Sequence, residues 1–156
     1  MEFNYEFLYS IGLYIWFGAP FILIPALIVL PAPYGKFSNS KFGFLVNGKL
    51  AWFLQELISP LLWNLTFFAF TKQPNKLQWI CWAMWNIHYF NRTVIYTYRA
   101  ASMKPSPFAI MMSAVAFNII NGFINGYHVA NYVTESNFPN IKVSSYSFTS
   151  VCYHPV

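Results

Sequence analysis

The stretch FLYSIGLYIWFGAPFILIPALIVL, residues 7–30, contains no charged side chain. An α-helix needs about 20 apolar residues to cross a lipid bilayer, so this stretch predicts a transmembrane helix. Pro20 and Pro25 should kink it, which spanning helices tolerate when neighbouring helices satisfy the released carbonyl groups. Glu2 and Glu6 precede the stretch in place of a basic region, so we do not expect a cleavable signal peptide.

Three further apolar blocks follow, and the whole composition agrees with them. Of the 156 residues, 57% are hydrophobic and only 8% are charged, far fewer than in soluble domains. The sequence therefore predicts an all-α integral membrane protein with four transmembrane helices that enclose a polar-lined cavity. We expect one transmembrane domain over residues 1–133, with spans at about 7–30, 51–70, 77–98 and 107–133, and a polar tail over 134–156.

The net charge of +5 does not indicate a nucleic-acid partner. The nine basic residues are scattered singly between apolar blocks and form no basic helix. Basic residues just outside membrane spans are the better explanation. The first and third loops carry more of them than the remaining polar segments do, and the region before Phe7 carries none. By the positive-inside rule, this distribution predicts that the N-terminus lies outside the cytoplasm.

Each of the last three predicted spans carries one polar stripe at helical spacing. Ionisable groups at bilayer depth cost at least about 2.5–3.5 kcal/mol each when they face lipid, so the stripes should turn inward. We expect all three to face one shared cavity. The stripes consist of Trp52, Gln55, Glu56 and Ser59 in the second span, Trp85, His88, Tyr89, Arg92 and Tyr96 in the third, and Asn118, Asn121, Gly122 and Asn125 in the fourth.

Glu56 and Tyr89 are the candidate catalytic residues. A buried carboxylic acid that stays protonated donates a hydrogen bond, and so does a phenol. Two donors that converge on one carbonyl oxygen stabilise the negative charge of an enolate, which suits enone chemistry. His88 and Arg92 are candidates to support this pair. The alternative for Arg92 is a structural counter-ion to Glu56, and for His88 a buried imidazole without a special role.

Other features of the sequence have mainly structural explanations. The asparagines of the fourth span can hydrogen-bond between helices, with Gly122 and Gly126 allowing close approach. Cys81 and Cys152 indicate neither a disulfide framework nor a zinc site. No metal-binding or nucleotide-binding motif is present, so we expect no metal.

The order and spacing of five segments resemble the steroid 5α-reductases. The segments are PYGKFS (33–38), AWFLQEL (51–57), HYFNRTVIY (88–96), KPSP (104–107) and FNIINGFINGY (117–127). The resemblance implies a membrane-embedded 3-oxo-5α-steroid 4-dehydrogenase of the endoplasmic reticulum, with a lumenal N-terminus. Such an enzyme transfers a hydride from NADPH to C5 of a 3-oxo-Δ4-steroid, and C4 takes a proton.

The resemblance also assigns roles to individual residues. It implies that Glu56 and Tyr89 hold the 3-keto oxygen, and that Trp52, Tyr34 and Phe117 line the steroid pocket. Asn121, with the glycine that follows it, matches the Asn-Gly pair of the family and is placed with the substrate-binding residues.

Two departures limit what the family implies. Asn125 stands where the family has a glutamine, and the tail from residue 134 resembles nothing in the family. Family members have seven spanning helices, and the spans that have no counterpart here carry most of the NADPH contacts. We therefore expect the front part of such an enzyme, whether as a fragment, a splice variant or an imperfect gene model.

Two other functions remain open from the sequence. The same cavity suits a reductase of another α,β-unsaturated lipid, such as an enoyl-CoA or a polyprenal. A truncated, non-catalytic sterol-binding membrane protein is the alternative from a different class. The sequence does not identify the steroid or the oligomeric state.

Overall fold

The computed structural model describes residues 4–29 and 40–134, and it is built almost entirely of helices. Residues 76–99 form the third helical run, which is continuous but changes from α-helical to π-helical hydrogen bonding at Asn91. The main elements are α1 (Tyr5–Val29), α2 (Gly48–Phe70), α3 (Lys76–Phe90), a π-helical turn η3 (Asn91–Ile95), the short helix α4 (Tyr96–Arg99) and α5 (Phe108–Tyr132).

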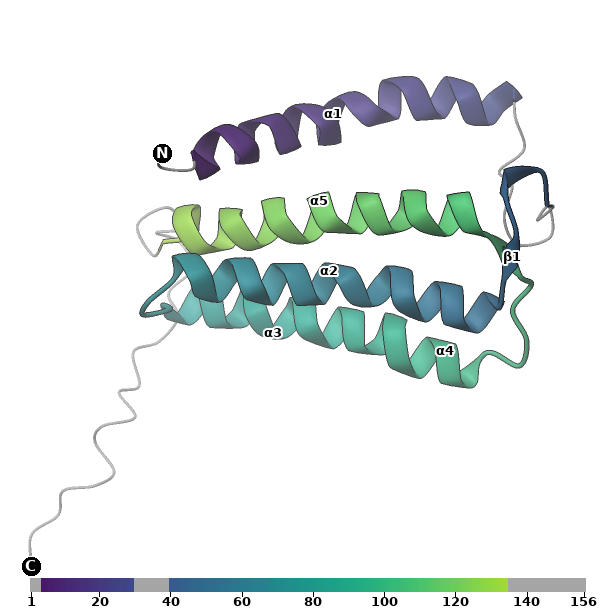
Figure 1. The fold of residues 1–156 in the computed structure, drawn as a ribbon. Coiled ribbons are helices and arrows are strands. Elements are labelled where there is room, and N and C mark those ends of the chain that lie inside the picture. The colour runs from purple at the N-terminus through teal and green to yellow at the C-terminus, as the bar shows by residue number, and fades with distance from the viewer. Residues whose placement is uncertain (1–3, 30–39, 135–156) are drawn as a thin grey trace, which may run out of the picture.

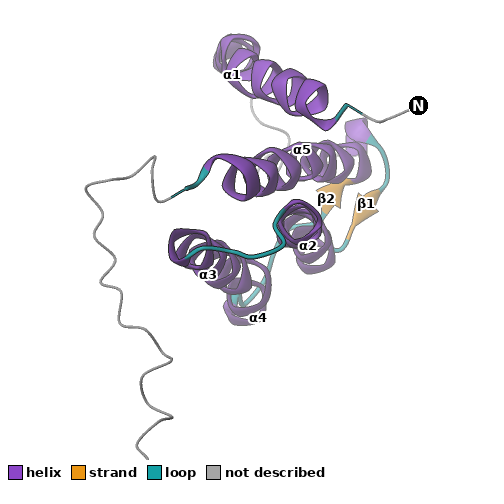
Figure 2. Ribbon diagram, turned by 90° about the vertical axis from the view of Figure 1, so that its left-hand side faces the viewer, coloured by secondary structure: helices purple, strands orange, loops and turns teal. Residues whose placement is uncertain are grey.

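Short elements join the helices at one end. A 3₁₀ turn, η2 (Ser40–Phe42), leads into the two-residue strand β1 (Leu45–Val46), which pairs antiparallel with β2 (Ser106–Pro107). This small sheet ties the segment before α2 to the segment before α5 (Figure 2). As a result α2 and α5 begin at the same end of the bundle, at the right of Figure 1.

Within the part of the chain that the structure describes, three helices, α1, α2 and α5, are long and apolar enough to cross a membrane. The chain is an all-α integral membrane protein, as the apolar blocks predict. The third predicted span, 77–98, corresponds to the run from α3 through η3 to α4. Its regular part, α3, has 15 residues, so the predicted number of four spans stays a prediction.

The helices pack side by side in the order α1, α5, α2, α3 (Figures 1 and 2). The most extensive packing joins α2 and α5. Two glycines of α5 permit it: a Cβ atom on Gly122 would lie 2.6 Å from the carbonyl oxygen of Ser59, and one on Gly126 would lie 2.7 Å from that of Trp63. Small residues one turn apart let helix backbones approach closely in membranes. This close contact sets the orientation of both polar stripes.

The first helix packs through its N-terminal half. The Tyr9 hydroxyl hydrogen-bonds to Nδ1 of His128 at 2.8 Å, and the Trp16 ring stacks on Phe117 with centroids 4.7 Å apart. The second half of α1 exposes large apolar side chains, for example Phe21 at 82% and Ile28 at 80%. Such a surface suits contact with lipid or with other apolar helices.

The turn between α2 and α3 also fastens the far end of α5. Asn75 and Gln78 form a reciprocal capping box at the start of α3. The Gln78 amide donates to the carbonyl oxygens of Val129 and Ala130, and the Asn75 amide donates to that of Val133 at 2.9 Å. These carbonyl groups belong to the last turn of α5 and to Val133, which follows the last residue of the helix. Carbonyl groups at this end of a helix lack partners within the helix.

We therefore expect Asn75→Ala to destabilise the fold more than loss of a simple helix cap does. Loss of the cap should lower the free energy of unfolding by about 0.5–2 kcal/mol. Loss of the bond to Val133 should lower it by about 0.5–1.5 kcal/mol more. Asn47→Ala is the matched control, because Asn47 caps α2 through the amides of Lys49 and Leu50. Thermal unfolding in detergent measures both. If Asn47→Ala lowered the stability as much as Asn75→Ala or more, the expectation would be contradicted.

Candidate functional site

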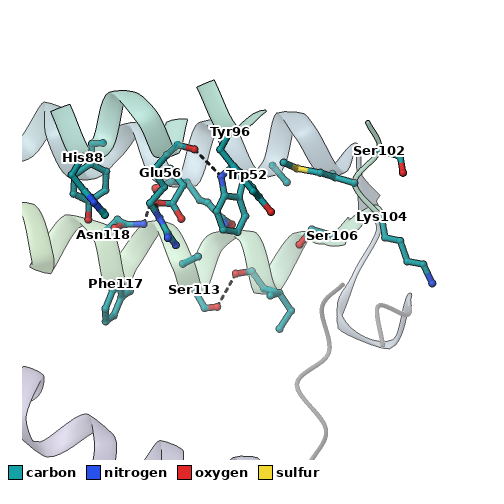
Figure 3. A pocket seen from close by; sticks show the side chains of 18 of the residues that line it. Trp52, Glu56, His88, Tyr96, Ser102, Lys104, Ser106, Ser113, Phe117 and Asn118 are labelled. Atoms are coloured by element: carbon teal, nitrogen blue, oxygen red, sulfur yellow. Dashed lines mark hydrogen bonds and ion pairs between the residues drawn. The ribbon is translucent and has the colours of Figure 1, made fainter. Parts of the chain in front are cut away.

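A cavity of about 980 Å³ lies against one face of α2, between the third helical run and α5 (Figure 3). One residue of α1, Leu23, also reaches it. The cavity mixes apolar walls with polar groups, as ligand sites usually do. Its polar and aromatic lining consists of Trp52, Gln55, Glu56, His88, Tyr89, Arg92, Tyr96, Ser102, Lys104, Ser106, Ser113, Phe117 and Asn118.

Most of the residues singled out in the sequence lie in this lining. They are Trp52, Glu56, His88, Tyr89, Arg92 and Phe117. Asn121 is buried behind the lining and reaches the site through Tyr89. Tyr34 lies outside the described residues. The functional roles of all these residues stay predictions.

Glu56 and Arg92 form an ion pair between α2 and the π-helical turn. Nε of Arg92 donates to Oε2 of Glu56 at 2.5 Å. The Glu56 side chain is only 6% exposed, whereas that of Arg92 is 44% exposed. The structure thus adopts the counter-ion arrangement that the sequence left open. In this arrangement Glu56 accepts the hydrogen bond from Arg92, and Arg92 and Tyr89 are hydrogen-bond donors in the lining beside it.

The π-helical turn places Arg92 against Trp52. The Trp52 indole N–H donates to the Arg92 carbonyl oxygen at 3.1 Å, and the guanidinium carbon lies 4.9 Å from the centre of the Trp52 ring. The Tyr96 ring also packs against Trp52, and the centres of the two rings lie 5.3 Å apart. π-Helical turns interrupt regular α-helix hydrogen bonding and frequently occur at functional sites.

The Tyr89 side chain is buried and held in place by hydrogen bonds. Its hydroxyl accepts from the Asn121 amide at 2.8 Å, and the same amide donates to Ser59 at 3.1 Å. Its carbonyl oxygen accepts from the Thr93 hydroxyl at 2.5 Å. The Ser59 hydroxyl also contacts that of Tyr89. Because Asn121 only donates to the phenol oxygen, the phenol proton remains for Ser59 or for a ligand acceptor.

The other two asparagines of the stripe differ in what they connect. The Asn118 amide donates to the Gln55 carbonyl oxygen of α2 at 2.8 Å, whereas the Asn125 amide donates within α5, to the carbonyl oxygen of Asn121 at 2.9 Å. The interhelical explanation of the stripe therefore describes the contact of Asn118 but not that of Asn125. Within residues 4–29 and 40–134, no group of three or more His, Cys, Asp or Glu side chains lies close enough to hold a metal ion.

Comparison with known proteins finds relatives over most of this chain. Steroid 5-alpha-reductase DET2 of Gossypium hirsutum is 36% identical to this chain over 132 residues, which are 80% of this chain and 47% of that protein. Over this region the chain is similar to the steroid 5-alpha-reductases. Steroid 5-alpha-reductase DET2 of Arabidopsis thaliana is 34% identical over 81% of this chain and 50% of its own length.

More distant members of the steroid 5-alpha-reductase family match as well. The 3-oxo-5-alpha-steroid 4-dehydrogenase 1 of Rattus norvegicus is 29% identical over 72% of this chain and 44% of its own length. The chain thus spans about half the length of the curated relatives it matches. No protein-family profile matches the chain.

The NADPH that the family implies fits the described residues poorly. A dinucleotide phosphate needs several cationic or N–H donors around its phosphate groups. The cations in the described lining are Arg92 and Lys104, and Arg92 is already paired with Glu56. Figure 3 shows Lys104 near Ser102, at the end of the cavity away from His88. The described lining of this cavity therefore does not form a dinucleotide phosphate site.

Sequence reasoning missed three connections at this site. These are the π-helical turn, the bond from the Trp52 indole to the backbone of Arg92, and the bond from Asn121 to Tyr89. Spacing places residues on a helix face, but it does not reveal a change of hydrogen-bond register within one helix. Thr93 is buried beside Tyr89, but no pattern in the sequence singles this residue out.

Proposed function

We propose that this chain forms the ketone-binding part of a membrane reductase that converts 3-oxo-Δ4-steroids to 5α-steroids with NADPH. Support comes from the names of the relatives, which are steroid 5-alpha-reductases and 3-oxo-5-alpha-steroid 4-dehydrogenases. The matched region includes Trp52, Glu56 and Tyr89. Because the chain spans about half of those relatives, the activity and the substrate remain proposals for the whole protein.

The observation that carries the proposal is a cluster of hydrogen-bonding groups in a cavity that also has apolar walls. Tyr89 and the Glu56–Arg92 pair line the same space of about 980 Å³. A hydroxyl and a guanidinium that both donate to one ketone oxygen would stabilise the negative charge that develops there during reduction of the conjugated double bond. An apolar ring system suits the remaining walls.

Conversion of a 3-oxo-Δ4-steroid tests this function directly. The protein is expressed in cell membranes, supplied with the steroid and NADPH, and its products are separated by liquid chromatography with mass detection. We expect the 5α-reduced steroid to accumulate above the level of membranes that lack the protein. Absence of product from folded protein would overturn the catalytic part of the proposal.

Sterol binding without reduction is the second candidate. It is favoured by the poor fit of NADPH phosphates to the described lining, where Lys104 is the one cation outside an ion pair. Retention of a ketosteroid by the purified protein, with no binding of NADPH and no turnover, would select this candidate.

We further propose that the protein resides in the membrane of the endoplasmic reticulum with its N-terminus in the lumen. The basic residues Lys41, Lys49, Arg99 and Lys104 gather at the end of the bundle where α2 and α5 begin, which the positive-inside rule places in the cytoplasm. Protease protection of an N-terminal epitope tag in sealed microsomes tests the orientation.

A further inference from the structure

Segments that are distant in the chain form one basic surface at the end of the bundle where α2 and α5 begin (Figure 1). The antiparallel pairing of β1 with β2 brings the segment before α2 beside the segment before α5. The two backbones are so close that a Cβ atom on Gly48 would lie 2.3 Å from the carbonyl oxygen of Lys104. The basic residues of this surface are Lys41, Lys49, Arg99 and Lys104.

The described residues supply no carboxylate group to balance these cations. Within residues 4–29 and 40–134, the acidic residues are Glu6 and Glu56. Glu6 lies in the first turn of α1, at the opposite end of the bundle, and Glu56 is paired with Arg92. The basic surface therefore keeps an excess of positive charge, which attracts an anionic partner.

The length of α2 places the basic surface at the depth of the lipid headgroups. Its 23 residues span about 35 Å at a rise of about 1.5 Å per residue, slightly more than the apolar layer of about 30 Å. The start of α2 then lies at the boundary of that layer. Lysine and arginine side chains reach from this boundary to polar groups. Exposed apolar side chains lie close to the cations along the chain, namely Phe42, Phe44, Leu45 and Tyr98.

We propose that the basic surface binds the headgroups of anionic phospholipids. The depth of the cations and the apolar side chains beside them favour a lipid over a soluble anion, which would gain nothing from the apolar groups. The proposed orientation places this surface at the cytoplasmic leaflet, which carries the anionic lipids. A bound headgroup would also lie next to Ser102 and Lys104, which line one end of the cavity (Figure 3). The inference concerns a second ligand class and does not depend on the reaction.

The test measures which phospholipids stay bound to the purified chain. The chain is reconstituted in nanodiscs with equal amounts of phosphatidylserine and phosphatidylcholine, and the lipids that remain after transfer to detergent are counted by native mass spectrometry. Each cation near an anionic surface contributes about a fivefold preference. We expect phosphatidylserine to be retained at least about 10-fold over phosphatidylcholine, and this preference to fall at high salt.

Two double variants locate the binding. Lys41→Gln combined with Lys49→Gln removes two cations of the basic surface, neither of which lines the cavity. We expect it to lower the preference for phosphatidylserine about 10-fold. Lys72→Gln combined with Lys76→Gln is the matched control, because it removes the same charge between α2 and α3, at the opposite end of the bundle. We expect this control to keep the preference. Arg99→Gln with Lys49→Gln replaces the first variant if that variant does not fold.

Three results would overturn the inference. Equal losses of preference in the two double variants would indicate a general effect of net charge, without a site at this end. An unchanged preference after loss of Lys41 and Lys49 would place the lipid elsewhere. Displacement of phosphatidylserine by inorganic phosphate or NADP⁺ would assign the cations to a soluble anion. None of these results bears on steroid reduction, so the proposed function is tested separately.

Discussion

We expect Tyr89→Phe to reduce 5α-reduction by about 10²–10³-fold, the usual cost of removing one donor to a developing oxyanion. The measurement is product formation in membranes where the unaltered protein reduces a 3-oxo-Δ4-steroid. The phenyl ring keeps its packing against Trp85, whose ring centroid lies 5.0 Å away. Asn121 keeps its bond to Ser59, so the buried amide is not left without a partner.

Tyr98→Phe is the matched control for this substitution. Tyr98 lies nine residues further along the same helical run, is 86% exposed and does not line the cavity. We expect the Tyr98→Phe variant to be as active as the unaltered protein. If Tyr89→Phe lowers the amount of folded protein as much as it lowers product formation, its hydroxyl has a structural role and the assignment is wrong.

The second large effect concerns stability. We expect Gly122→Leu to destabilise the protein by about 3 kcal/mol, at the upper end of the usual cost of overpacking. A Cβ atom at this position would lie 2.6 Å from the Ser59 carbonyl oxygen and 2.8 Å from Cβ of Leu62. Neither atom can move without shifting α2. The separation of α2 from α5 would also disturb Asn121, which bonds to Tyr89.

Gly18→Leu provides the comparison for Gly122→Leu. A Cβ atom on Gly18 would meet nothing within 4 Å. We expect this variant to unfold at the same temperature as the unaltered protein or slightly higher, because leucine has the greater helix propensity. Thermal unfolding in detergent measures both variants. If both substitutions lowered the unfolding temperature to a similar extent, the close approach of α2 and α5 would not be a main source of stability.

Much of the fold follows from the apolar blocks. The stretch 7–30 predicts a spanning helix where α1 covers Tyr5–Val29, and the stretch 107–133 predicts one where α5 covers Phe108–Tyr132. The helix α2 begins at Gly48, before the predicted residue 51, because Asn47 caps it. Apolar length does not reveal such a cap. It also does not reveal the π-helical turn, which depends on backbone hydrogen bonds.

The candidate site was less predictable than the fold. Helical spacing places Glu56 and Tyr89 on inward-facing stripes, and both line the cavity. Spacing does not decide which partner a buried carboxyl group takes, so the Glu56–Arg92 pair remained one of two alternatives. The rotation of α5 that brings Asn121 to Tyr89 depends on the close contact at Gly122, which is a property of two packed helices.

The most direct test of the central claim is photolabelling with a 3-oxo-Δ4-steroid, whose enone reacts with nearby groups under ultraviolet light. The purified protein in nanodiscs is irradiated, digested and mapped by mass spectrometry, with and without excess unlabelled steroid. We predict labels on the cavity lining, at Trp52, Tyr89 or Phe117, that disappear under competition. Labels confined to lipid-exposed positions such as Leu61 and Leu65, unaffected by competition, would contradict a ketosteroid site in this cavity.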